Sequence, residues 1–172
     1  PTAFDVDGDG AEDVMLDYRD FVAVHRGLDG SLIRPITAMP RVPKGWVMAY
    51  NSFTPVYRPG QDKPDFFVPL GHGGIGLLGN DLITEIWTHK PYYDTPAKVA
   101  LIDVDGDGRT EAGYEEQRDG QFVCRDLITG TEEWRLKLDG QGYGPAVSAD
   151  FDSDGKGEFL IGNICIGTNT DG

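Results

Sequence analysis

Short runs of apolar residues, each bounded by Gly, Pro, Asp or Asn, recur along the whole chain. Short apolar runs bounded by such residues are typical of β-strands. The clearest examples are residues 13–18, 99–102, 121–125, 133–138, 146–149 and 158–162. No segment shows helical periodicity. The pattern therefore predicts an all-β fold of short antiparallel strands joined by tight turns.

Three nine-residue segments rich in aspartate align without gaps and set a period for the chain. They begin at Asp5, Asp103 and Asp150, and each has the form Asp-x-Asp-x-Asp-Gly-x-x-Asp/Glu. The last two begin 47 residues apart, and the first two begin 98 residues apart, which is close to two periods. A further copy is therefore expected to begin near residue 54, and at residues 57–65 a turn-rich stretch ends in Asp65 and runs into apolar residues.

A second motif recurs in phase with the first. Asp-Leu-Ile-Thr occurs at residues 81–84 and 126–129, followed by Trp87 and Trp134, which we expect to pack between successive sheets. Four strands in roughly 47 residues fit a β-propeller blade, whereas the alternative, a β-solenoid, usually has shorter repeats. We therefore expect residues 1–172 to be a single β-propeller segment of about three and a half blades, with units near 1–50, 51–96, 97–143 and 144–172. Because closed propellers have about four to eight blades, further blades are expected from the parent chain or from partner chains.

The aspartate-rich segments have the donor pattern of a calcium loop. Carboxylates at positions 1, 3, 5 and 9 and a backbone carbonyl at position 7 let one turn surround an ion, and hard oxygen donors in a flexible loop suit Ca²⁺ better than Mg²⁺. The candidate metal residues are Asp5, Asp7, Asp9, Ala11, Asp13, Asp103, Asp105, Asp107, Arg109, Glu111, Asp150, Asp152, Asp154, Lys156 and Glu158. An EF-hand is excluded because it needs flanking helices and an acid at position 12, which here is Leu16, Tyr114 or Ile161. The remaining alternative is a solvated turn without metal.

Up to three structural Ca²⁺ ions are thus expected, and extracellular modules typically bind calcium at about 10⁻⁴–10⁻³ M, which favours secretion or the cell surface. The formal charge of −14 argues against nucleic acid as a partner. No apolar run is long enough to predict a membrane span. Cys124 and Cys165 could form one bridge or remain two thiols.

The three acidic segments resemble the calcium loop of FG-GAP/VCBS-type β-propeller repeats, which occur in integrin α-subunit heads and in many bacterial secreted proteins. The resemblance implies metal roles for the acids at positions 1, 3, 5 and 9. Residues 57–65 depart from the pattern, since Tyr57, Pro59 and Gln61 replace the acids. The Thr-Gly-x-x-x-Trp element at 129–134 resembles turns of quinoprotein-like propellers, and together with calcium loops it is similar to bacterial rhamnogalacturonan lyases.

No catalytic motif stands out in the sequence. Candidate ligand-binding residues are His72 in a glycine-rich turn, and Tyr92, Tyr93 and Tyr143, which precede strands and could stack on sugar rings; His72 could equally be an ordinary turn residue. Three functions remain open. The chain could be a propeller module for adhesion or for binding carbohydrate or protein, part of a polysaccharide lyase acting by β-elimination, or an architectural subunit of an extracellular assembly.

Overall fold

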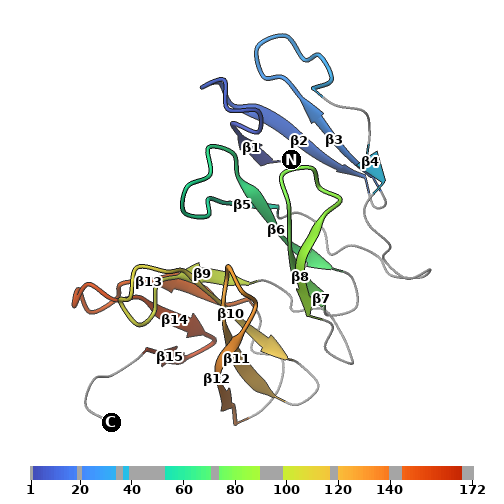
Figure 1. Ribbon diagram of the computed structural model, residues 1–172. Coiled ribbons are helices and arrows are strands. Elements are labelled where there is room, and N and C mark those ends of the chain that lie inside the picture. Colours follow the sequence, from blue (N-terminus) through green and yellow to red (C-terminus); the bar gives the residue numbers. More distant parts are fainter. Residues whose placement is uncertain are drawn as a thin grey trace. The chain divides into compact units, whose positions relative to one another are not determined.

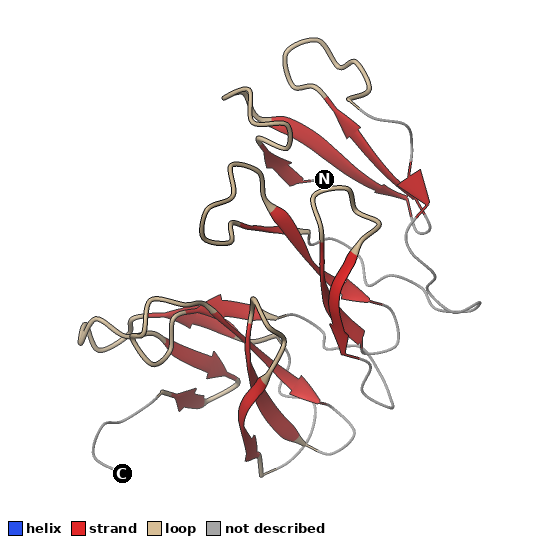
Figure 2. Cartoon of the chain, in the orientation of Figure 1, coloured by secondary structure: helices blue, strands red, loops and turns tan. Residues whose placement is uncertain are grey.

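The computed structural model describes residues 2–18, 21–33, 37–38, 53–70, 74–89, 99–116, 120–139 and 145–167. In these ranges the chain consists of strands, turns and loops without a helix, as Figure 2 shows. The all-β prediction is confirmed. The described residues contain no helix that is long and apolar enough to cross a membrane. The chain divides into two compact units, Pro1–Lys90 and Pro91–Gly172, and each is described by itself.

The first unit holds two four-stranded antiparallel sheets in which every strand pairs with the next one along the chain (Figure 1). The strands of the first sheet are β1 (Thr2–Phe4), β2 (Asp13–Tyr18), β3 (Phe21–His25) and β4 (Thr37–Ala38). Those of the second sheet are β5 (Thr54–Val56), β6 (Asp65–Leu70), β7 (Gly74–Leu78) and β8 (Glu85–His89). This meander is the arrangement of a propeller blade.

The second unit repeats the same meander. Its four-stranded sheet consists of β9 (Ala100–Ile102), β10 (Glu111–Glu116), β11 (Gln121–Asp126) and β12 (Glu132–Lys137). Its other sheet has three described strands, β13 (Val147–Ala149), β14 (Glu158–Ile161) and β15 (Ile164–Ile166). Each of the four expected repeat units thus contains one antiparallel sheet.

Aromatic side chains fill the space between the two sheets of each unit. In the first unit the rings of Phe4 and Phe66 lie 5.3 Å apart between centroids. In the second unit Phe122 and Phe159 are fully buried, with centroids 5.3 Å apart. Trp134 adds its ring to this core at 6.0 Å from Phe122 and 6.4 Å from Phe159. It therefore packs between successive sheets, as its recurrence in the sequence predicted.

Trp87 occupies the position in the second sheet that Trp134 has in the third. Trp87 pairs with Leu77 and Trp134 with Cys124, and a register shift immediately follows each of these pairs. The ring of Trp87 lies 6.1 Å from that of Phe67 in its own sheet. The repeat seen in the sequence is thus also a repeat of strand register.

Main-chain hydrogen bonds also connect the sheets of the second unit. The N–H of Gly157 donates to the carbonyl oxygen of Asp103 at 2.8 Å. A Cβ atom on Gly157 would lie 2.2 Å from Cγ1 of Ile102, so only glycine allows this approach. Cys124 is buried and Cys165 exposed, and both are free thiols.

Candidate metal centres

Each acidic segment is a turn that joins the first two strands of its sheet. Turn 5–13 lies between β1 and β2, turn 103–111 between β9 and β10, and turn 150–158 between β13 and β14. In the first two turns the apolar residue at position 2, Val6 or Val104, is fully buried and belongs to the core. Burial of this residue anchors the turn to the sheet.

The same hydrogen bond closes all three turns. The N–H of position 2 donates to the carboxylate of position 9 at 3.0 Å in turn 5–13 and at 2.8 Å in each of the other two. These carboxylates belong to Asp13, Glu111 and Glu158. One oxygen of each position-9 carboxylate is therefore used by the backbone.

The first aspartate of each turn orders the loop that follows it. The Asp5 carboxylate accepts hydrogen bonds from the N–H groups of Gly10, Gly8 and Asp9. These bonds favour the charged form and lower the pKa of Asp5, with the Gly10 bond contributing most. Asp103 accepts from two backbone N–H groups of its turn in the same way, and Asp150 also accepts from two.

Positions 4 and 6 require a left-handed backbone. The φ angles of Gly8 and Gly10 are +81° and +88°, and those of Gly106 and Gly108 are +79° and +86°. Glycine adopts such angles without steric cost. In turn 150–158 position 4 is Ser153, at φ +64°. The small residues at positions 4 and 6 thus let the loop turn back, so that the carboxylates of positions 1, 3 and 9 can approach one another.

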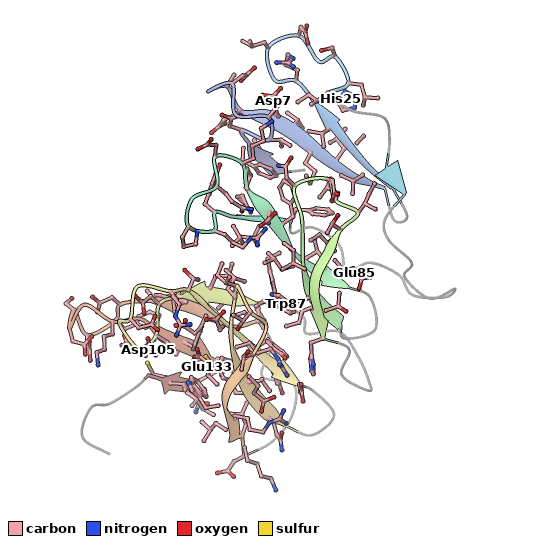
Figure 3. The ribbon with its side chains drawn as sticks, in the orientation of Figure 1. Asp7, His25, Glu85, Trp87, Asp105 and Glu133 are labelled. Atoms are coloured by element: carbon pink, nitrogen blue, oxygen red, sulfur yellow. The ribbon has the colours of Figure 1, made fainter. Side chains whose placement is uncertain are left out.

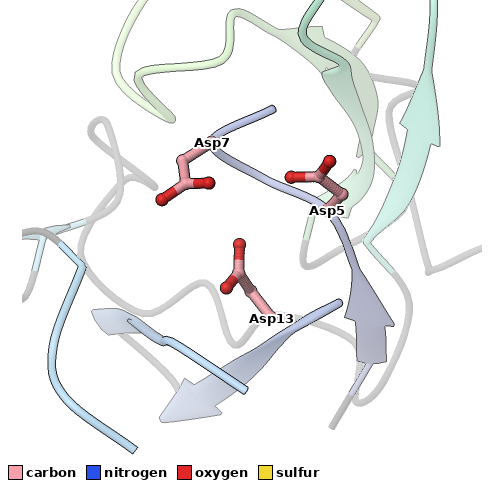
Figure 4. Close-up of side chains that lie close together, drawn as sticks. All are labelled: Asp5, Asp7 and Asp13. Atoms are coloured by element: carbon pink, nitrogen blue, oxygen red, sulfur yellow. The ribbon is translucent and has the colours of Figure 1, made fainter. Parts of the chain in front are cut away.

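Carboxylate oxygens from positions 1, 3 and 9 meet in every turn. The groups are Asp5, Asp7 and Asp13; Asp103, Asp105 and Glu111; and Asp150, Asp152 and Glu158. Each residue contributes one oxygen, and the oxygens of a group all lie within 4.8 Å of one another. Figure 4 shows the three carboxylates of turn 5–13 directed toward a common space.

The acid at position 5, which was also expected to coordinate the ion, lies outside these groups in all three turns. Oδ1 of Asp9, Asp107 and Asp154 accepts a hydrogen bond from the N–H of position 7, at 2.8 Å in each case. The position-7 donors are Ala11, Arg109 and Lys156. This local hydrogen bond ties the position-5 carboxylate to the backbone two residues later.

Turn 5–13 contains a buried carboxylate oxygen that a bound cation would stabilise. Asp13 is fully buried; its Oδ2 accepts the Val6 N–H, but its Oδ1 has no hydrogen-bond partner. A buried carboxylate oxygen without a partner is costly. Because Asp13 stands beside Asp5 and Asp7, an ion in this group would satisfy that oxygen. Three converging carboxylates form a hard, flexible donor set that fits Ca²⁺.

Turn 103–111 has an additional acid that sequence analysis did not identify. The pKa of Glu111 is raised to about 7, chiefly by burial and also by the charges of Glu133, Asp105 and Asp103, against the lowering effect of the Val104 N–H. The pKa of Glu133, on β12, is itself raised by burial and by Asp105. Figure 3 labels Glu133 and Asp105 in the second unit. The one sequence signal is that Glu133 immediately precedes the recurring tryptophan.

Two of the acidic turns carry a guanidinium group. In turn 5–13, Nη1 of Arg26 donates to Oδ2 of Asp9 at 2.6 Å and Nη2 donates to Oδ2 of Asp7 at 3.0 Å. In turn 103–111, Arg109 donates to Oδ2 of Asp107 through Nε and Nη2, and to Oδ2 of Asp126 through Nη1 at 2.8 Å. Arg26 thus contacts a converging carboxylate, while Arg109 bonds two acids outside the group.

Turn 57–65 joins β5 to β6 and carries its own positive charge. Nε of Arg58 forms an ion pair with Oδ2 of Asp65, whose side chain is only 3% exposed. Oδ1 of Asp65 accepts the N–H of Asn80 at 3.1 Å. Both oxygens of this buried carboxylate therefore have protein partners, and the charge of the Arg58 guanidinium balances that of Asp65.

The four candidate ligand-binding residues, His72, Tyr92, Tyr93 and Tyr143, lie outside the described residues.

Comparison with known proteins supports the fold. No protein-family model and no curated protein matches the sequence. Solved structures do match. The chain is similar to one in the crystal structure of BBS1N in complex with ARL6DN, soaked with lead, with a TM-score of 0.61 and 13% identity over 94% of this chain and 48% of that one. It is also similar to Bacillus licheniformis rhamnogalacturonan lyase PL11, with a TM-score of 0.58 and 15% identity over 96% of this chain and 40% of that one.

A chain of the mitotic checkpoint complex matches with a TM-score of 0.53 and 17% identity, over 87% of this chain and 41% of that one. The chain thus spans less than half the length of the solved chains it matches. The neighbouring folds are β-propeller-like or β-sandwich-like. At these identities the similarity establishes an all-β fold of antiparallel sheets, and nothing about activity.

Proposed function

We propose that this chain is a calcium-stabilised segment of an extracellular β-propeller that binds a polysaccharide or an extracellular protein. The main support for calcium binding is the set of three converging carboxylates in turn 5–13, in which the buried Oδ1 of Asp13 has no hydrogen-bond partner. Turns 103–111 and 150–158 present the same group on the same hydrogen-bonded frame. The four sequential meanders and the similarity to propeller-like structures support the fold.

Calcium fits these turns better than magnesium. Three carboxylates converge in each turn, and the position-5 carboxylate is bonded to the position-7 N–H instead of joining them. Ca²⁺ accepts six to eight oxygens in variable geometry and water can supply the remainder, whereas Mg²⁺ requires near-ideal octahedral geometry. Because such sites fill at extracellular calcium levels, the proposal includes secretion or display at the cell surface.

A thermal melt in calcium and in chelator tests the proposal. At tenfold saturation each site would stabilise the fold by about 1.4 kcal/mol, so EGTA should lower the melting temperature. Asp105→Ala should reduce this shift and the calcium stoichiometry measured by titration calorimetry. Asp62→Ala, which removes the same charge from an exposed position in turn 57–65, is the matched control. An unchanged melt in chelator would contradict structural calcium.

A second candidate is that the chain is part of a polysaccharide lyase. The similarity to rhamnogalacturonan lyase PL11 over 96% of this chain favours it. In that case the calcium turns would stabilise a propeller whose ligand-binding face carries the chemistry. Ultraviolet absorbance of the unsaturated product, measured on pectic polysaccharide with the complete parent protein, would support this candidate. No product, together with binding to a glycan array, would favour a binding module.

A further inference from the structure

One backbone position lies beside the acidic turn in both the first and the third sheet. Arg26 follows β3 and Asp126 ends β11. The N–H of each donates to the carbonyl oxygen five residues later, at 2.8 and 3.0 Å, and the carbonyl of each accepts the N–H four residues later, at 2.8 and 2.9 Å. Asp126 pairs with Glu111, the last residue of its turn, and His25, just before Arg26, pairs with Val14. The two positions are therefore structurally equivalent and carry opposite charges.

The charge at this position determines which acids a nearby guanidinium contacts. In the first sheet the position is itself the arginine, and its Nη2 reaches Oδ2 of Asp7, one of the three converging carboxylates. In the third sheet the position is Asp126, and it takes Nη1 of Arg109. Arg109 also donates to Asp107 through Nε and Nη2. None of its described hydrogen bonds reaches Asp103, Asp105 or Glu111.

In the turn of the second sheet a guanidinium neutralises the position-9 carboxylate. In turn 57–65 Arg58 pairs with the buried Asp65, the residue at position 9, and this turn lacks the acids at positions 1, 3 and 5. Turn 5–13 is intermediate, because it has all four acids and also an arginine on two of them. A divalent ion bound by Asp7 would be repelled by the Arg26 charge and would weaken the Asp7–Arg26 bond.

We propose that Arg26 is a built-in competitor for the cation of turn 5–13, whereas Asp126 holds Arg109 away from the converging carboxylates of turn 103–111, so that turn 103–111 binds Ca²⁺ more tightly. This inference rests on the proposed function, since it concerns the affinities of the same turns. Exposed ion pairs contribute about 0.2–1 kcal/mol each. Only the pair with Asp7 involves a converging carboxylate, so removing it should tighten turn 5–13 by about 1.4-fold to fivefold.

Titration calorimetry with calcium chloride on the full chain tests the competition. Arg26→Met keeps the apolar stem and removes the charge, and it should tighten the site of turn 5–13 by that factor. Arg135→Met, which removes the same charge from an arginine bonded to Glu132 and Gln121, should leave every site unchanged. Arg26→Met in an Asp5→Asn background should have no effect on the two remaining sites, which assigns the change to turn 5–13.

Asp126→Asn provides an independent test of the inference in the other unit. It keeps the Oδ1 acceptor for the N–H groups of Ile128 and Thr129 but weakens the hold on Arg109, so turn 103–111 should bind calcium less tightly. Weaker or unchanged binding in Arg26→Met, or unchanged binding in Asp126→Asn, would overturn the inference. Absence of any calcium heat in the unsubstituted chain would instead refute the proposed function.

Discussion

The contact between Gly113 and Phe159 provides a sharp test of how successive sheets pack in the second unit. Gly113 lies on β10, and a Cβ atom there would be 2.6 Å from Cε1 of Phe159 and 2.7 Å from Cζ of Phe122. Both rings are fully buried. In Gly113→Ala the rings must therefore retreat by close to an ångström from positions that are packed on all sides.

The expected cost follows from two opposing terms. Overpacking a well-packed core typically costs about 1–3 kcal/mol. Replacing glycine by alanine restricts the unfolded chain and returns about 0.4–1 kcal/mol. The two terms leave a net loss of about 0–2.6 kcal/mol. Because the added Cβ would lie below 3.0 Å from two buried rings, we expect about 1–2 kcal/mol, which in a chain of this size should lower the melting temperature by about 2–8 °C.

Urea denaturation followed by tryptophan fluorescence measures this loss, because Trp134 lies against both rings. Phe159→Leu shortens the side chain that alanine would meet. In a double-mutant cycle, Gly113→Ala should then cost less in the Phe159→Leu background than in the unsubstituted chain. Equal costs in the two backgrounds, or no loss of stability in Gly113→Ala, would refute this account of the packing.

Two further predictions concern titratable groups in the second unit. In calcium-free buffer Glu111, with a pKa of about 7 in the folded protein and about 4.5 when unfolded, favours the folded state at low pH; the free energy of unfolding should fall as pH rises from about 4.5 to about 7. Urea titrations should show this slope become shallower in Glu111→Gln, with the raised pKa of Glu133 still contributing, and an unchanged slope would contradict the assignment. Burial raises the pKa of the Cys124 thiol, whereas Cys165 is exposed, so Ellman's reagent should react with one thiol in the native chain and with two in urea. Two reactive thiols before unfolding would contradict the burial of Cys124.

The regular part of the fold could be predicted because its signals are local and repeated. The acidic turns recur with one period, and each lies between two strands, as at residues 5–13. The strand β7 (Gly74–Leu78) carries no such signal, because all five residues are buried and its two glycines are poor strand formers. Its place is fixed by pairing with β6 and β8. Alternation cannot reveal a strand that is covered on both faces.

The candidate metal centres could be predicted only where the donors are close in sequence. Positions 1, 3 and 9 converge, but position 5 does not, because the N–H of position 7 competes for its carboxylate, as Ala11 does for Asp9. Arg26 lies just after β3 and Glu133 lies on β12, so both are distant in sequence from the acids they approach, and the sequence alone does not show these contacts. The pairing of Arg58 with Asp65 has a visible sequence signal, the loss of three acids from the turn, but only the structure shows what replaced them.

The main-chain bond from Gly157 to the Asp103 carbonyl has a consequence for how repeats of this kind diverge. Its donor and acceptor are main-chain atoms, so substitutions at other positions leave them in place. At residue 157 itself proline would remove the donor, and any other side chain would clash with Ile102. Side chains of the two repeats can change extensively while the coupling between them persists. Local opening of one repeat breaks a bond of its neighbour, so fluctuations should propagate between adjacent repeats as in a one-dimensional nearest-neighbour system.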